Sequence, residues 1–125
     1  MFEAVPFQVT LPASDMERAK AWYETVLGLR PVEEDDGGVA WYETGGLRFM
    51  LYASEFAGTN QATAASLTAP DFDGAMALLR SRGAAFEQYD FGEFKTVDGV
   101  LEMPDGRRAS WVKDSEGNIL AITSE

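Results

Sequence analysis

The 125-residue sequence contains no cysteine and no histidine. Without cysteine the chain cannot form a disulfide, a thiolate nucleophile, a cysteine-ligated zinc site or an iron–sulfur cluster. Without histidine it cannot contain a Ser-His-Asp triad, an imidazole general base or a histidine–metal bond. Most familiar catalytic machinery is therefore excluded, although general acid–base chemistry by the many carboxylates remains open.

Basic residues are also scarce, because ten Lys and Arg stand against 21 Asp and Glu, for a formal net charge of −11. This charge repels phosphate backbones and anionic membrane surfaces, so we expect neither nucleic acid nor a membrane as a partner. No apolar run approaches the ~20 residues of a membrane span, and Met1 to Leu11 lacks the basic start of a secretory signal. We therefore expect a cytoplasmic protein.

The length suits one compact domain and is too short for two independent folds. Hydrophobic residues make up 46% of the chain and charged residues 25%, which is an ordinary globular mixture. Folding at this length buries roughly two-thirds of the chain's surface. We expect a single domain over residues 1–125.

The first half of the sequence indicates a strand, a helix and three more strands. Residues 7–11 alternate apolar and polar side chains, which predicts a half-buried strand with Phe7, Val9 and Leu11 facing one way. Ser14 and Glu17 match a capping box at the start of a helix. The apolar residues of that helix recur at three- and four-residue spacing, and a glycine suits its left-handed end. These residues are Met16, Ala19, Trp22, Tyr23, Val26 and Gly28. Three extended segments follow, separated by turns rich in Gly and Asp, at 29–34, 39–43 and 47–53.

The same order recurs after a small polar linker at residues 55–61. A strand at 64–69 precedes a helix that begins at Pro70-Asp71 and ends at Gly83. Four extended runs follow, at 85–89, 100–103, 107–113 and 119–123, with an irregular stretch at 90–98. Asp15 and Asp71 lie 56 positions apart, so two copies of one unit are the simplest account. We expect an α+β fold of two βαβββ modules, residues 1–54 and 62–125, that form a curved mixed sheet around a cavity.

Three segments carry a family resemblance: VTLPASDMERA at 9–19, then WY at 22–23 with LGL at 27–29, and DSEGNIL at 114–120. Together they resemble the vicinal oxygen chelate superfamily. This group contains glyoxalase I, extradiol dioxygenases, fosfomycin resistance enzymes and bleomycin resistance proteins. The resemblance spans nearly the whole chain and implies the paired βαβββ fold, whereas the members differ in their chemistry.

In the metal-dependent relatives, inward residues on the first and last strand of each module hold a divalent metal, mostly through His and Glu. The resemblance places these positions on Gln8, Met50, Ala64 and Ala121. One amide and one thioether cannot supply the N and O donors that Mg, Mn, Fe or Zn require. We therefore expect no metal and no cofactor. The sequence is more similar to the metal-free, ligand-sequestering relatives, such as bleomycin resistance proteins, than to the enzymes.

Candidate ligand-binding residues are aromatic and polar side chains on the predicted strands and in the irregular stretch. Alternation places Arg48, Met50 and Tyr52 on one face, opposite Phe49, whose face we expect beneath a helix. The predicted site comprises Gln8, Thr10, Trp41, Arg48, Met50, Tyr52, Ser66, Phe91, Phe94 and Trp111. Core packing is the competing interpretation of each aromatic residue, and Tyr52 and Trp111 are the strongest candidates for ligand contact.

Three further features of the sequence are an aromatic stretch, an acidic run and the carboxylates beside the late turns. The aromatic stretch at 90–96 predicts either a lid over the cavity or a contact with another subunit. The acidic run at 33–36 is expected to be a solvated hairpin end, with attraction of a cationic ligand as the alternative. Carboxylates beside the late turns are expected to be solvated as well. These are Glu102, Asp105, Asp114 and Glu116.

The leading functional hypothesis is a binding protein that holds an apolar or aromatic small molecule, with a cationic one as an option, and does not turn it over. In the relatives this type of protein serves in antibiotic resistance. The alternative is a metal-free or unconventional glyoxalase-like lyase or isomerase, in which Tyr52 could donate a proton. A third hypothesis is a degenerate interaction module with a collapsed cavity. The resemblance also implies a homodimer with the pocket at or near the subunit boundary.

Overall fold

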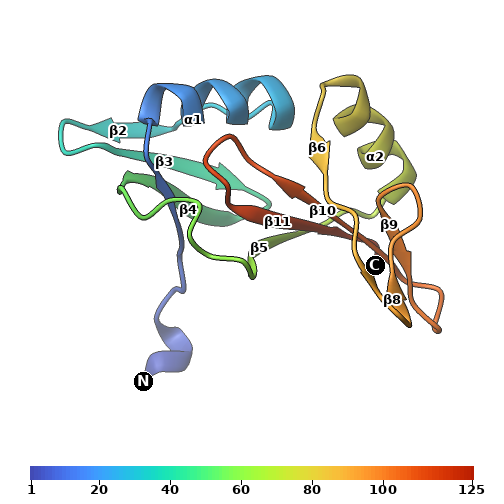
Figure 1. Cartoon of the computed structure of the whole chain (residues 1–125). Coiled ribbons are helices and arrows are strands. Elements are labelled where there is room, and N and C mark those ends of the chain that lie inside the picture. Colours follow the sequence, from blue (N-terminus) through green and yellow to red (C-terminus); the bar gives the residue numbers. More distant parts are fainter.

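A computed structural model describes all 125 residues and confirms an α+β fold with two helices and two main mixed sheets (Figure 1). The helices are α1 (Met16–Trp22) and α2 (Phe72–Ser81); a π-helical turn extends α1 over Tyr23–Leu27, and a short 3-10 helix covers Phe2–Ala4. The strands are β1 (Val9–Ala13), β2 (Glu33–Asp35), β3 (Val39–Thr44), β4 (Leu47–Ala53), β5 (Thr63–Thr68), β6 (Ala85–Phe86), β7 (Asp90–Phe91), β8 (Phe94–Lys95), β9 (Val100–Glu102), β10 (Arg108–Lys113) and β11 (Ile119–Thr123). No helix of the structure is long and apolar enough to cross a membrane.

The first sheet has the order β1-β4-β3-β2, with β1 parallel to β4 and the other pairs antiparallel. Its strands alternate as the sequence predicts. Phe49 and Leu51 of β4 are buried in the core that α1 covers, whereas Met50 and Tyr52 are only half-buried on the opposite face. One face of this sheet is therefore covered by a helix, and the other, which we call the open face, is not.

The second sheet repeats this arrangement in the order β5-β11-β10-β6, with β9 also paired to β10. The first strand of each sheet again lies parallel to the last one, as β5 does to β11. Phe72, Met76 and Leu79 of α2 pack in the core, as do Val112 and Leu120 of the sheet. The matching strand order supports the duplication inferred from the 56-residue offset.

The buried cores of the two sheets are continuous. One cluster of 15 buried residues includes Leu11, Tyr23 and Leu51 from the first half and Met76 and Ile122 from the second. Figure 1 shows α1 above the first sheet and α2 above the second. The helices therefore cover the same side of the two-sheet layer, and the open faces lie on the other side.

A buried polar turn joins the halves and corrects the expectation that its carboxylates are solvated. Asp114 accepts hydrogen bonds from the Tyr23 hydroxyl at 2.7 Å and from the Asn118 amide at 2.8 Å. Glu116, whose side chain is 0% exposed, forms an ion pair with Arg18 at 2.8 Å. Both carboxylates are buried, and each has a partner in α1 or its extension that lies 91 or 98 residues away in the sequence. Glu102 and Asp105 are exposed, as expected.

The start of α1 also differs from the predicted capping box. The N-cap is Asp15, whose carboxylate accepts from the Arg18 backbone N–H at 3.1 Å. The Ser14 hydroxyl instead donates to Glu116 at 3.3 Å. Glu17 forms an ion pair with Lys20 at 2.9 Å. The Ser14 hydroxyl, which would cap the helix in a capping box, therefore hydrogen-bonds to the distant Glu116 carboxylate instead.

The N-terminal residues depart from the predicted strand. Strand β1 begins at Val9, where pairing with β4 begins at Phe49, and no strand lies beside residues 1–8. Phe7 is consequently 94% exposed, so the prediction that it shares the buried face with Val9 and Leu11 is wrong. In Figure 1 this segment extends away from the body of the molecule.

Candidate functional site

Six of the ten predicted site residues lie in or beside the first sheet. Thr10, Met50 and Trp41 are register partners on β1, β4 and β3, so they form a row across the open face. Tyr52 forms the next row with Val39 on β3. All of these side chains are exposed or half-buried. Gln8 precedes β1 and is exposed.

Arg48, the sixth residue, is fixed by neighbours on the same sheet. Its guanidinium lies 4.7 Å from the ring centroid of Trp41, within cation–π range. Its Nη2 donates to Glu33 at 3.0 Å, whereas its Nε is buried without a hydrogen-bond partner and lies 3.9 Å from a Glu43 oxygen. The Arg48 guanidinium on the open face is thus surrounded by the carboxylates of Glu33 and Glu43 and by the indole ring of Trp41.

The other predicted aromatics gather beside the second sheet, where Trp111 lies on β10. Strands β7 and β8 form a hairpin within the stretch expected to be irregular. Phe94 lies 5.5 Å from Trp111 and 6.1 Å from Phe91, measured between ring centroids. Phe91 is 73% exposed. Because Trp111 pairs with Ala121, on the face opposite the core residue Leu120, this cluster lies on the open face of the second sheet.

Tyr89 completes this cluster and was not predicted from the sequence. Its ring lies 5.5 Å from Trp111 and 6.0 Å from Phe91, again between centroids. Burial raises the pKa of its hydroxyl, and the charge of Glu87 adds to this effect. The one sequence signal for Tyr89 is that it lies two positions before Phe91, because side chains two positions apart in an extended segment point to the same side. The four rings, Tyr89, Phe91, Phe94 and Trp111, are called the aromatic cluster below.

The aromatic cluster and residues 61–63 line a hollow of about 270 Å³. Trp111 donates from its indole nitrogen to the Thr63 hydroxyl at 3.2 Å, which fixes the ring. Ser66, the last predicted residue, is exposed on β5 beside Ala121. Gln8 and Thr10 line a separate hollow of about 360 Å³ with the N-terminal segment. No aromatic contact or side-chain hydrogen bond joins the six predicted residues of the first half of the chain to the four predicted residues of the second half.

The positions that the resemblance assigns to metal ligands do not fit a divalent ion. Met50 is half-buried, Gln8 is exposed, and the two alanines have no donor atom. No group of three or more His, Cys, Asp or Glu side chains in the chain is arranged to hold a metal ion. We therefore derive no step through a metal.

The most strongly perturbed carboxylate belongs to the buried turn and not to either open face. Burial by itself would raise the pKa of Glu116. Hydrogen bonds from Arg18, the Asp15 backbone N–H and Ser115, with the charge of Arg18, outweigh it and lower that pKa to about 2. This carboxylate therefore stays ionised and paired, which suits a structural role and not proton transfer.

Fold and site together define a class: a protein of two βαβββ units with helices on one side and open sheet faces on the other. The chain belongs to the Glyoxalase/Bleomycin resistance protein/Dioxygenase superfamily, whose sequence model matches residues 6–122. This confirms the family predicted from the sequence motifs. No curated protein matches the chain significantly.

Solved structures share the fold at low sequence identity. A glyoxalase/bleomycin resistance protein/dioxygenase from Alicyclobacillus acidocaldarius has a TM-score of 0.75 and 18% identity, over 97% of this chain and 91% of its own. A bleomycin-binding protein complexed with bleomycin has a TM-score of 0.72 and 18% identity, over 95% and 97%. A lactoylglutathione lyase from Agrobacterium tumefaciens has a TM-score of 0.72 and 17% identity, over 97% and 93%. At these identities the likeness concerns the fold.

Proposed function

We propose that this protein binds and sequesters a small molecule without a metal, in the manner of the bleomycin resistance type. The observation that carries this proposal is the aromatic cluster on the open face of the second sheet. Phe91 is 73% exposed and Phe94 39% exposed, although aromatic rings gain free energy by leaving water. A planar apolar or aromatic ligand that covers these rings would recover that free energy.

The charges near the open faces favour a cationic ligand over an anionic one. Arg48 is already engaged by Glu33 and lies near Glu43, so it offers no free positive charge to an anion. The formal net charge of −11 raises the concentration of cations near the protein surface. The aromatic cluster presents exposed rings, and ring faces bind cations favourably.

A homodimer is part of this proposal, because the predicted site is divided within one chain. Gln8 and Thr10, at the start of the first sheet, line one hollow, and the aromatic cluster lines another. A second copy that places its open face against the first sheet would bring the two groups together. The exposed N-terminal side chains Phe2 and Phe7 also favour a covering partner, since they are 79% and 94% exposed.

Isothermal titration tests the binding proposal. The full chain is titrated with a panel of planar aromatic compounds, cationic, neutral and anionic, that includes bleomycin-type antibiotics. We expect a cationic or neutral member to bind in the micromolar range or tighter, with the same affinity in EDTA. Uniform failure across the panel would contradict the proposal.

The second candidate is a metal-free lyase or isomerase, and the position of Tyr52 favours it. This phenol is half-buried on the open face between β1 and β3, where it could reach a bound ligand. Turnover of a bound compound in EDTA, abolished by Tyr52→Phe with binding retained, would support it. A stoichiometric divalent metal in elemental analysis, or activity that EDTA abolishes, would contradict both metal-free proposals.

A further inference from the structure

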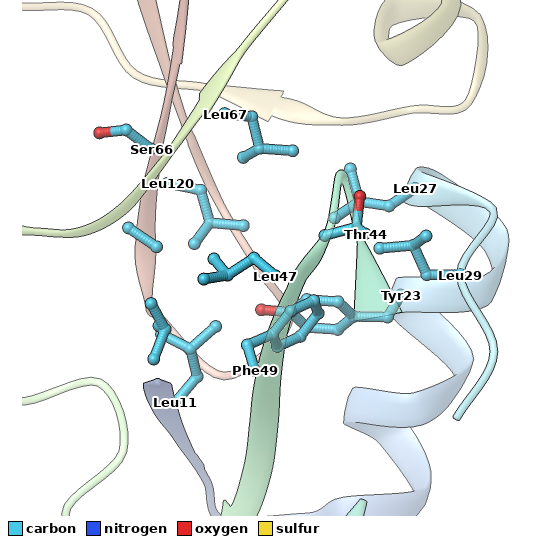
Figure 2. Close-up of a pocket in the computed structure, with 12 residues that line it drawn as sticks. Leu11, Tyr23, Leu27, Leu29, Thr44, Leu47, Phe49, Ser66, Leu67 and Leu120 are labelled. Carbon is cyan, nitrogen blue, oxygen red and sulfur yellow. The ribbon is translucent and has the colours of Figure 1, made fainter. Parts of the chain in front are cut away.

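A third hollow, which we call the crevice, lies between the two halves of the chain, on the helix-covered side of the first sheet and away from both open faces (Figure 2). It measures about 90 Å³, and ten of its 12 lining residues are hydrophobic. Figure 2 shows Leu27 and Leu47 from the first half and Leu67 and Leu120 from the second around this space. None of the predicted site residues except Ser66 lines it.

The floor of this crevice is buried, and its rim is exposed. Leu11, Tyr23, Phe49 and Leu120 are at most 8% exposed, whereas Leu47 at the rim is 44% exposed. The crevice is therefore open to solvent on one side and apolar throughout its depth.

The polar groups around the crevice are few and neutral. No charged side chain lines it, in a chain of formal net charge −11. The Tyr23 hydroxyl is already committed to Asp114 at 2.7 Å, so it offers nothing to a ligand. Thr44 and Ser66 are exposed, and the Ser66 hydroxyl points away from the leucines in Figure 2. Only Thr44 can meet a polar head group at the rim.

We propose that this crevice binds the end of a neutral alkyl chain, independently of the ligand proposed for the open faces. An apolar cavity of about 150 Å³ holds benzene, so the smaller crevice suits a chain of a few carbon atoms. A charged end group would lose its hydration without gaining a partner here, whereas a hydroxyl can remain at the rim beside Thr44. The ligand class is a short primary alcohol or the neutral alkyl tail of a larger molecule.

The test is a titration of the full chain with 1-pentanol, followed by methyl NMR of the leucines. We expect saturable shifts confined to the leucines of the crevice, and affinities at least about tenfold weaker for pentylamine and pentanoate. Leu47→Ala removes part of the wall and should weaken pentanol binding severalfold. Its matched control is Leu78→Ala, on α2 outside the crevice, because Leu78 is exposed to a similar extent at 48%.

A filling variant and an open-face variant complete the experiment. Ala65 is half-buried and lines the crevice, so Ala65→Leu should abolish the pentanol shifts. Trp111→Ala should leave them unchanged, which separates this inference from the proposed function. Shifts that do not saturate, or that survive Ala65→Leu, would overturn the inference. So would a dimer that Ala65→Leu dissociates, because a second copy would then occupy the crevice.

Discussion

At the scale of single residues, two buried tyrosines differ in whether the hydroxyl has a hydrogen-bond partner. The Tyr23 hydroxyl donates to Asp114, whereas the Tyr42 hydroxyl is buried with no hydrogen-bond partner. Burial raises both pKa values, that of Tyr42 to about 12, and the nearby Asp114 charge raises that of Tyr23 further. Both phenols are therefore neutral at pH 7.

This difference predicts opposite results for the same substitution. Tyr23→Phe should lower the free energy of unfolding by about 1–2 kcal/mol, because Asp114 loses a buried hydrogen bond. Tyr42→Phe removes a hydroxyl that is buried without a partner, so it should be neutral or stabilising. Urea denaturation at pH 7 measures both changes. Equal losses in the two variants would contradict the hydrogen-bond assignment.

The lowered pKa of Glu116 predicts a loss of stability in acid. Its pKa is about 2 in the folded chain against an ordinary value of 4.5, so the folded state favours the ionised form. The stabilisation is complete above about pH 5 and is lost as the pH falls toward 2. Glu116→Gln should therefore lower the free energy of unfolding at pH 7 by about 2–3 kcal/mol, and by about half as much at pH 3.

Urea denaturation of the wild type and Glu116→Gln at both pH values measures this change. The control is Glu55→Gln, because Glu55 is exposed and forms no ion pair. A deficit in Glu116→Gln as large at pH 3 as at pH 7 would show that the carboxylate charge is not the cause.

At the scale of elements, the buried turn and the linker touch through two glycines. A Cβ on Gly117 would lie 2.8 Å from the Gly58 Cα, a distance that real Cβ contacts do not show. Gly106 has a similar positive φ, 88° against 89°, but its Cβ would meet nothing within 4 Å. An alanine at Gly106 would therefore report the cost of a left-handed backbone alone, whereas an alanine at Gly117 would add a clash with the Gly58 backbone.

We expect Gly106→Ala to lower the free energy of unfolding by about 1–2 kcal/mol, from the left-handed backbone alone. Gly117→Ala should cost about 1–3 kcal/mol more, because the linker must also move. Thermal and urea unfolding of the two variants gives the comparison. Equal losses would mean that the linker yields freely and does not hold the turn.

Local sequence patterns predict some of the elements and miss others. The stripe of α1 and the alternation of β4 gave the correct buried faces, because each depends on residues a few positions apart. The cap at Ser14 and the burial of Asp114 and Glu116 were missed, because their partners lie about 100 residues away in the sequence. The hairpin at 90–95 was missed because its strands have two residues each.

The candidate site, too, was predictable only where it depends on residues close together in the sequence. Alternation predicted which residues share a sheet face, as Arg48, Met50 and Tyr52 do. It could not predict how the two faces lie relative to each other, since this depends on packing between the halves. The crevice of Figure 2 is likewise formed by residues from both halves, and no sequence signal indicated it.

At the scale of the whole molecule, the net charge of −11 predicts how salt affects binding. A cationic aromatic ligand should bind more weakly as the salt concentration rises from 50 to about 500 mM, because salt screens the attraction. A neutral aromatic ligand of similar shape should show little change. Titration of both ligands at several salt concentrations measures the difference. Identical salt dependence would exclude long-range charge from recognition.

The central claim is that the aromatic cluster binds the ligand without a metal. The most direct measurement compares Phe91→Ala with Phe56→Ala, because these exposed phenylalanines are 73% and 69% exposed and only Phe91 belongs to the cluster. Isothermal titration in EDTA, with the tightest compound of the panel, should show about tenfold weaker binding for Phe91→Ala. Phe56→Ala should bind as the wild type does. Equal affinities of the two variants, or wild-type binding that EDTA abolishes, would contradict the account.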